Sequence, residues 1–503
     1  MNTKLTHAFI AIGVACLVGC KSDIIGIKTE NLLPQTFTVT DTIIRLGDSR
    51  YTTKVQVRWW ATDRDGFVKG YEIATDRPIK PSTVWRFTQS TDSIFTFVIP
   101  EGKDTSDFMV SIRAIDNNNA KDASPAQIIV PIKNSKPLVA FQYVPDGGNP
   151  LSGGNQTLAY PVLKLTWKAS DPDGFDNLKH TEIYLNDTTR TPFVVPALFG
   201  SVVVIGNDLT GSSTACNVLV GNSNIPNSQT LAGLLLNDSN RFYCRSVDLS
   251  GAKSPLVRSK TIFVKKPKSK ILLVNAYTDG DGLIDQFYQT QLAAQSIFNF
   301  DLMQLLKKDR NQYTQLAPDN RTQNLVFGLF DHIVWYGGDL DFSMVYAQNT
   351  LVNFLNSGGN LLLSVKVAGS SPLKTSFYDF SPIDSLKTAP NGTTLLLADS
   401  SKIRGIANNG YPILTHSEFN SAVRPIKFVD GTSVLLTADI LSRDNTTFDI
   451  TNYTGARSIM GLKTNSVSGS KFIFSALQLH KLNGANNIGL LFQKILIDEF
   501  RVR

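Results

Sequence analysis

Histidine and cysteine are scarce in this sequence, with five and four copies among 503 residues. The five histidines are dispersed, and none stands at the spacing of a zinc site. Long apolar runs are missing as well. After residue 20 no segment has the roughly 20 apolar residues that a helix needs to cross a bilayer. The sequence therefore gives no sign of a zinc protein or of a membrane-spanning protein.

A basic surface of the kind that binds nucleic acid is also missing. The formal net charge is +7, but the charges are scattered along the chain. Their densest run, at residues 265–270, is interpreted as a linker, and nucleic-acid recognition would need a basic face with aromatic side chains. We therefore expect no nucleic-acid partner. Hydrophobic and charged contents of 42% and 18% are typical of a folded chain.

The first 20 residues have the features of an export signal. Lys4 precedes an apolar run over residues 8–17, which is too short to span a bilayer. The ending Leu17-Val-Gly-Cys20 resembles the bacterial lipobox. This resemblance implies removal of residues 1–19 as a signal peptide and diacylation of Cys20, with residues 20–30 as a tether. A plain signal peptide or a buried strand is the alternative.

The lipobox resemblance also implies a location. The residue after Cys20 is Lys21 and not Asp, which in lipoproteins of familiar Gram-negative bacteria implies the outer membrane. The membrane is then a partner through the N-terminal lipid. Whether the protein faces the periplasm or the cell surface stays open.

Two cysteines remain for the folded part. Cys16 leaves with the signal and Cys20 carries the lipid, so Cys216 and Cys244 are left. An oxidising compartment allows a disulfide between them. Two separate buried thiols are an equal alternative, because sequence does not give the Cα separation that a bridge requires.

An internal repeat follows the tether. Residues 55–66 and 163–174 both run from an alternating strand into Asp-x-Asp-Gly, and residues 108–116 and 241–248 form a matching second half. The pattern resembles fibronectin type III-like modules and predicts β-sandwiches at 31–133 and 136–264, the second with an insertion. We interpret Asp63/Asp65 and Asp171/Asp173 as turn residues in preference to calcium ligands.

After residue 270 the pattern changes. Apolar strands at residues 271–275, 332–336 and 360–367 alternate with helical spacing, whereas residues 370–455 look irregular. Such alternation predicts a mostly parallel sheet covered on both faces. The predicted fold is therefore multidomain, with two all-β sandwich modules followed by an α/β three-layer domain at 271–503.

Three segments of this last region resemble the class I glutamine amidotransferase-like fold. They are Asp331-His-Ile-Val-Trp-Tyr-Gly-Gly338, Leu355-Asn-Ser-Gly-Gly-Asn-Leu-Leu-Leu-Ser-Val-Lys366 and Gln478-Leu-His480. That family's chemistry needs a cysteine nucleophile, a histidine and an acid. The histidine matches His480, but the other two roles fall on Val365 or Lys366 and on Leu482. We therefore predict no catalytic residue.

Ligands of such sheets bind beyond the carboxyl ends of the strands. We therefore predict a non-catalytic pocket, and its lining residues are Tyr336, Gly337, Gly338, Lys366 and His480.

A nearby loop is a weak calcium candidate. It contains Asp279, Asp281 and Asp285 between a strand and a helix, where Asp also caps helix starts. No other cofactor is expected.

These features predict a lipid-anchored outer-membrane or surface protein. Its C-terminal domain would bind a glycan, a small ligand or an envelope protein without catalysis. An alternative is an envelope hydrolase with a non-standard active site. That alternative requires His480 within hydrogen-bond reach of a carboxylate inside a cleft. A purely structural envelope protein is a third possibility.

Overall fold

The computed structural model describes residues 30–43, 54–97, 103, 105–143, 157–277, 282–305, 308–309, 312–313, 319–367, 375–406 and 409–502. The chain divides into two compact units, Met1–Ser135 and Lys136–Arg503. The predicted lipobox and tether lie almost entirely outside the described residues. Within those residues no helix is both long and apolar enough to cross a membrane.

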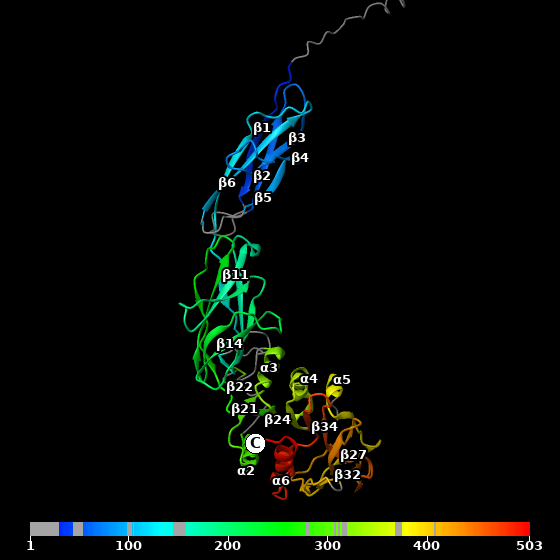
Figure 1. Cartoon of the computed structure of the whole chain (residues 1–503). Helices are drawn as coiled ribbons and strands as arrows, with labels where there is room; N and C mark the ends of the chain where they lie inside the picture. The colour runs from blue at the N-terminus through cyan, green and yellow to red at the C-terminus, as the bar shows by residue number, and fades with distance from the viewer. Residues whose placement is uncertain are drawn as a thin grey trace, which may run out of the picture. The chain divides into compact units, whose positions relative to one another are not determined.

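The first unit is a β-sandwich of two antiparallel sheets (Figure 1). One sheet contains β1 (Gln35–Ile43), β2 (Lys54–Thr62) and β5 (Asp92–Thr96); the other contains β4 (Arg86–Thr88), β3 (Val68–Ala74), β6 (Thr105–Asp116) and β7 (Ala126–Lys133). Alternation in β2 buries Val55, Val57 and Trp59 against Ile112 and Ala114 of β6. The predicted sandwich is confirmed.

A second sandwich opens the second unit. One sheet contains β8 (Leu138–Phe141), β10 (Val162–Ser170), β13 (Ser201–Gly206), β14 (Ser213–Val220) and β15 (Leu231–Leu235). The facing sheet contains β12 (Phe193–Pro196), β11 (Leu178–Leu185), β17 (Phe242–Asp248) and β18 (Val257–Arg258). A small sheet of β9 (Leu158–Ala159), β16 (Asp238–Asn240) and β19 (Ile262–Val264) closes one end. Leu165, Trp167 and Phe242 fill the core.

Cys216 and Cys244 lie in this core on opposite sheets, in β14 and β17. Both are free and completely buried. Burial raises the pKa of each thiol to about 12. The structure therefore has two separate, unreactive thiols in place of the disulfide that the sequence left open.

The C-terminal region is organised around a mixed sheet. In the described residues its strand order is β21-β20-β24-β25-β35-β34-β31-β28-β29. The bounds are β20 (Ile271–Asn275), β21 (Asp301–Gln304), β24 (His332–Asp339), β25 (Asn360–Lys366), β28 (Lys402–Gly405), β29 (Leu414–Thr415), β31 (Ser433–Ala438), β34 (Ser458–Thr464) and β35 (Lys471–Ser475). Pairing is parallel from β21 to β35 and antiparallel from β35 to β29.

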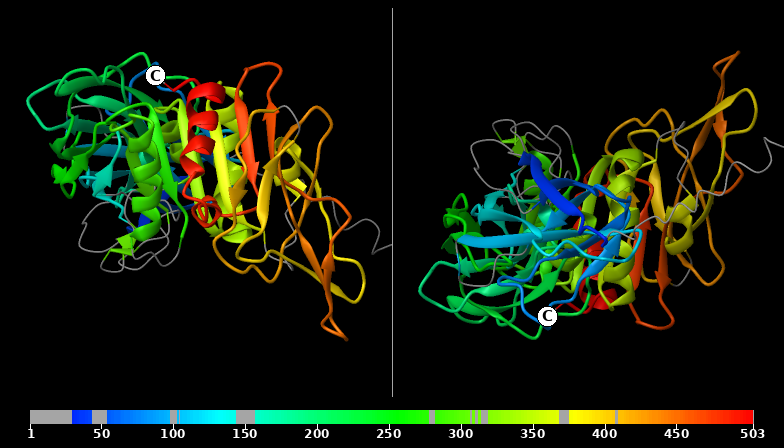
Figure 2. Two further views of the ribbon diagram at one scale, coloured as in Figure 1. Left: turned by 90° about the horizontal axis from the view of Figure 1, so that it is seen from below. Right: turned by 90° about the horizontal axis from the view of Figure 1, so that it is seen from above.

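The predicted α/β three-layer domain with a mostly parallel sheet is therefore wrong. Strands account for 45% of the structure and helices for only 13%. The segment expected to be irregular forms short strands that extend the sheet in antiparallel fashion and build further small sheets (Figure 2). These are β26 (Ile383–Leu386) with β30 (Ile426–Phe428), and β27 (Thr393–Leu396) with β32 (Leu441–Asp444) and β33 (Ile450–Asn452); β22 (Lys308–Asp309) pairs with β23 (Gln312–Tyr313) elsewhere.

Short helices cover the parallel strands. They are α2 (Leu283–Ala294), α3 (Asn320–Phe327), α4 (Leu340–Asn356), α5 (Thr375–Phe380) and α6 (Ile488–Gln493), followed by a π-helix at Lys494–Glu499. Because side chains alternate along β24, Ile333 and Trp335 join one core with Leu351 of α4. Val334 and Tyr336 join the opposite core, which contains residues of α2 and α6.

The second sandwich and this sheet share a hydrophobic core. Tyr160 and Val162 belong to the same buried cluster as Met303 and Phe330. The buried carboxylate of Asp301 accepts a hydrogen bond from the Tyr160 hydroxyl at 3.2 Å and pairs with Lys265 at 2.8 Å. The start of the segment predicted as a linker, residues 265–270, is therefore fixed to both parts. The other predicted domain boundaries, including the one between the second sandwich and the C-terminal region, stay predictions.

Candidate functional site

Side chains from the carboxyl ends of β20, β21 and β24 converge on one buried acid. Asp285 of α2 is 7% exposed. Its Oδ1 accepts hydrogen bonds from the Tyr336 hydroxyl at 2.6 Å and from Asn275 Nδ2 at 2.7 Å. Its Oδ2 accepts one from Gln304 Nε2 at 3.1 Å. Both oxygens of the carboxylate are therefore occupied by neutral donors, as burial of a charged group requires.

Two tyrosines fill the space beside this acid. The rings of Tyr288 and Tyr336 are stacked, with centroids 3.8 Å apart. Burial raises the pKa of both phenols, and for Tyr336 the bond to Asp285 adds to that rise. The Tyr288 hydroxyl donates to Ser364 Oγ at 3.3 Å, and Ser364 also accepts from Leu479 N. We call Asn275, Asp285, Tyr288, Tyr336 and Ser364 the strand-end cluster. Its phenols stay protonated, and its polar groups are satisfied internally.

The structure brings together most of the predicted pocket residues. Gly337 and Gly338 follow Tyr336, and Gln478 Nε2 lies 3.5 Å from the Gly337 carbonyl and 2.7 Å from the Tyr277 hydroxyl. A Cβ added at Gly338 would lie 3.3 Å from the Tyr277 ring. Tyr277 therefore occupies the centre of the predicted pocket, and the sequence analysis missed it.

Lys366 stands apart from this group. It is the last residue of β25, half-buried, and in register with Asp339. No hydrogen bond or ion pair within the described part of the chain joins it to the other predicted residues.

His480 is packed between aromatic rings. Its ring centroid lies 6.1 Å from that of Tyr277 and 6.2 Å from that of Phe287. Its Nδ1 is buried and has no hydrogen-bond partner among the described residues. Burial, with a smaller contribution from Lys481, lowers its pKa to about 4. The nearby carboxylate of Glu418 pairs with Lys481 at 2.7 Å, and among the described residues no carboxylate is hydrogen-bonded to the neutral His480 ring.

Of the three acids in the calcium candidate loop, only Asp285 belongs to the described residues. Asp279 and Asp281 lie outside the described residues, and Asp285 is occupied as described above. Within the described ranges, no group of three or more acidic, histidine or cysteine side chains is placed to hold a metal ion. A calcium ion at the 279–285 loop stays a prediction.

The repeated Asp-x-Asp-Gly segments form turns. Asp171 Oδ1 accepts from Asp173 N at 2.8 Å, and Gly174 N donates to the Asp171 carbonyl at 3.0 Å. In both repeats one carboxylate oxygen, Oδ2 of Asp63 and of Asp171, is buried without a hydrogen-bond partner in the described residues. Burial, with the charges of Asp173 and Asp248, raises the pKa of Asp171 to about 6.

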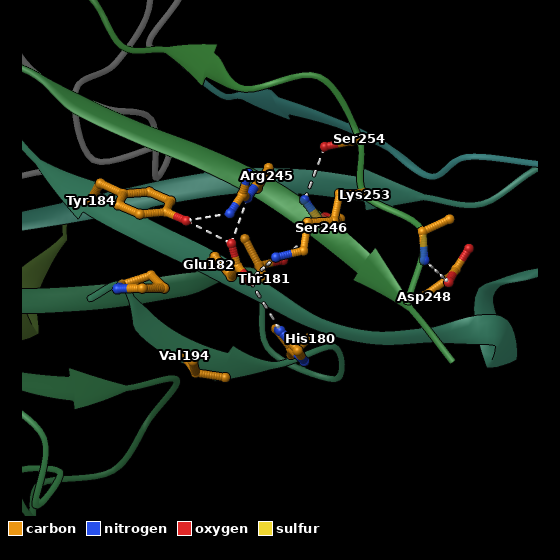
Figure 3. A network of polar contacts seen from close by, with 12 residues as sticks. His180, Thr181, Glu182, Tyr184, Val194, Arg245, Ser246, Asp248, Lys253 and Ser254 are labelled. Atoms are coloured by element: carbon orange, nitrogen blue, oxygen red, sulfur yellow. Dashed lines mark hydrogen bonds and ion pairs between the residues drawn. The ribbon is translucent and has the colours of Figure 1, made fainter. Parts of the chain in front are cut away.

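A charged network lies on the outer face of the second sandwich (Figure 3). Glu182 of β11 stands directly opposite Arg245 of β17 and pairs with it at 2.5 Å. Lys253 and the Tyr184 hydroxyl also bond to its carboxylate, at 3.1 and 2.7 Å. Burial alone would raise the pKa of Glu182, but the hydrogen bonds from Tyr184, Arg245 and Lys253 outweigh it and lower the pKa to about 2.

The first sandwich carries the same network at equivalent positions. Glu72 stands opposite Arg113 in the β3–β6 pair and bonds to it at 2.7 Å and to Lys121 at 2.8 Å. The Arg113 guanidinium lies 4.0 Å from the centre of the Trp85 ring. Sequence analysis missed both glutamates, although their shared position in the repeat was a usable signal. Because the charges are mutually neutralised, we assign the networks to stability.

An open cavity lies away from the strand-end cluster. Its volume is about 610 Å³. It is bordered by α4, α5 and the turn between β34 and β35, at the edge where β25 and β35 begin. Half of its twelve lining residues carry an amide or a hydroxyl group, four are apolar, and Asp379 and Lys463 are charged.

Comparison with known proteins gives a fold likeness only. Neither the family models nor the curated proteins match the sequence. Among solved structures, the chain is similar to a segment of two fibronectin type III domains from chicken tenascin, with 12% identity and a TM-score of 0.19 over 46% of this chain and 99% of that one.

Two further structures give the same result. The fibronectin(III)-like modules of Clostridium thermocellum CbhA share 12% identity, with a TM-score of 0.16 over 46% and 94% of the two chains. The PKD1 domain of Vibrio anguillarum Epp shares 12%, with a TM-score of 0.15 over 21% and 98%. Scores this low carry no argument about function, and the β-sandwich assignment rests on the strand pairings.

The hydrogen bonds of the strand-end cluster predict which of two tyrosine substitutions costs more stability. Tyr336→Phe removes a donor from a buried carboxylate and should destabilise the chain by about 1–3 kcal/mol. Tyr288→Phe, the matched control in the same ring stack, breaks only a longer bond between neutral groups and should cost about 0.5–1.5 kcal/mol. Calorimetric unfolding of residues 21–503 compares the two. An equal or larger loss in Tyr288→Phe would contradict the role given to Asp285.

The Glu182 network predicts a pH dependence. The pKa of Glu182 in the folded protein lies below the ordinary value of 4.5. The ionised carboxylate therefore stabilises the folded state fully above pH 4.5, and this stabilisation is lost as the pH falls towards 2. Glu182→Gln should therefore cost about 1–2 kcal/mol at pH 7, allowing for solvent screening, and the difference should shrink below pH 4.5.

Asp187→Asn is the control for that variant, because it breaks only an exposed pair with Arg190 and should change the stability far less than Glu182→Gln does. Unfolding midpoints measured between pH 3 and pH 7 give the comparison. A pH-independent effect of Glu182→Gln would show that packing, and not charge, is what it removes.

Proposed function

We propose that this chain is a lipid-anchored outer-membrane or surface protein whose C-terminal region binds a ligand without catalysing a reaction. One observation carries the non-catalytic half of the proposal. The strand-end cluster is closed by its own hydrogen bonds, and in the described part of the chain no carboxylate is hydrogen-bonded to the neutral His480 ring. An acid–base mechanism needs the opposite arrangement.

The binding half of the proposal is supported by the open cavity at the other edge of the sheet. Its size is in the range of small-molecule sites, about 300–1,000 Å³. The sandwich modules lie between Cys20 and this region in the sequence, and we assign them the role of spacers.

The proposed lipid anchor rests on the sequence alone. Residues 17–20 provide the lipobox, and Lys21 favours the outer membrane. Two or more acyl chains suffice for stable attachment.

An envelope hydrolase is the weaker candidate. It required a carboxylate within hydrogen-bond reach of His480. Of the acids that the structure describes near this ring, Glu418 is paired with Lys481, and Asp285 is held by Tyr336 and Asn275. This arrangement gives that candidate no support.

Anchoring predicts that Cys20→Ala abolishes incorporation of labelled palmitate. The wild-type chain should fractionate with membranes, and the variant should be released or keep an uncleaved signal. Cys16→Ala is the matched control, because it changes a cysteine inside the signal and should leave labelling intact. Labelling that persists in Cys20→Ala would exclude the lipobox.

Binding predicts a rise in thermal midpoint with at least one compound of a broad panel. The panel contains sugars, polysaccharides, peptidoglycan fragments, peptides and Ca²⁺, tested on residues 21–503. A ligand of the native state at a hundredfold excess over its Kd adds about 2.7 kcal/mol. No shift with any member would contradict small-ligand binding and favour a structural role.

A further inference from the structure

The cavity described above has a wall that is already formed. Gln348, Val352, Leu355 and Asn356 of α4 line it. Their spacing of four, three and one residues places them on one helix face. The facing turn is fixed, because Asn465 Oδ1 accepts from Val467 N at 2.9 Å and from Ser468 N at 3.1 Å. The Ser468 hydroxyl then ties this turn to the Leu355 carbonyl at 2.8 Å.

The charges of the lining balance. Lys463 is half-buried, and its Nζ donates to the carbonyls of Phe380 and Ser381 at 3.3 and 3.1 Å. Asp379 contributes one carboxylate to the same cavity. An anionic ligand would meet this carboxylate and a cationic ligand would meet the ammonium group, so the lining favours a neutral ligand.

The amide, hydroxyl and aromatic groups of the lining favour one class of neutral ligand. The lining contains the amides of Gln348, Asn356 and Asn465 and hydroxyls at positions 464, 466 and 470. Asn465 Oδ1 and Ser470 Oγ already accept hydrogen bonds within the protein, whereas the exposed hydroxyls of Thr464 and Ser466 can both donate and accept. Phe380 adds aromatic surface, and its ring stacks at 6.0 Å on Phe472, which is only 2% exposed. A ligand that matches both the polar groups and the aromatic surface has many hydroxyl groups around an apolar ring face. This is the chemistry of a sugar.

We propose that this cavity binds a neutral mono- or disaccharide. The proposal rests on the proposed function and names the ligand class and the place of binding. A ligand there would contact α4 and the β34–β35 turn and would not approach His480 or the strand-end cluster.

The test is calorimetric titration of residues 21–503 with glucose, galactose, mannose, N-acetylglucosamine, maltose, cellobiose and lactose. Glucuronic acid and glucosamine serve as charged probes, and both should bind more weakly than their neutral counterparts. Gln348→Trp should place an indole ring in the cavity, obstruct the ligand and weaken binding by about tenfold or more. Asn353→Trp is the matched control, because this exposed position on α4 is not part of the lining.

A second blocking variant covers the case in which Gln348→Trp fails to fold. Ser466→Trp changes an exposed position on the turn and should weaken binding to a similar degree. Binding of a neutral sugar that both blocking variants abolish supports the proposal.

The remaining outcomes separate this inference from the proposed function. Sugar binding that neither blocking variant alters would overturn the location. A panel in which peptides or Ca²⁺ raise the midpoint and no sugar binds would overturn the ligand class and leave the proposed function standing. A panel in which nothing binds would overturn both.

Discussion

A carboxylate buried at the end of a parallel sheet must be fully hydrogen-bonded, and the C-terminal sheet depends on how Asp285 meets this requirement. Its donors come from three neighbouring strands: Asn275 ends β20, Gln304 ends β21, and Tyr336 lies in β24. Because each donor must reach the same two oxygens, the relative register of the strands and the position of α2 are fixed together. The stacked tyrosines then close the remaining space.

This constraint determines where chemistry can occur. In open α/β sheets the ligand usually lies beyond the carboxyl ends of the strands. Here the protein's own side chains occupy that place, so the motif likeness around Gly337, Gly338 and His480 does not carry the family's site with it. Among the described residues, an open cavity lies at the opposite ends of these strands, where β25 and β35 begin, and function is argued from its groups.

Sequence predicted those elements whose signal is local and strong. The apolar run at 271–275 is β20, the alternating repeat became two sandwiches, and both Asp-x-Asp-Gly segments are turns. The prediction failed over residues 370–455, because strands of two to six residues rich in Ser, Thr and Asn carry little periodicity. Their antiparallel pairing depends on partners distant in sequence, such as β31 with β34. Tyr277 was missed because no local motif marks it.

The charged side chains of the two glutamate networks and those of the cavity differ in how much hydrogen-bonding capacity they leave for a ligand. Glu72 and Glu182 face an arginine and a lysine in equivalent places of both sandwiches, so their charges are used within the protein. Lys463 bonds only to carbonyls, and within the described residues neither it nor Asp379 forms an ion pair. A carbonyl leaves part of an ammonium group's hydrogen-bonding capacity unfilled, whereas a carboxylate neutralises it. Among the described residues, that difference favours the cavity over the two networks as the place to look for a ligand.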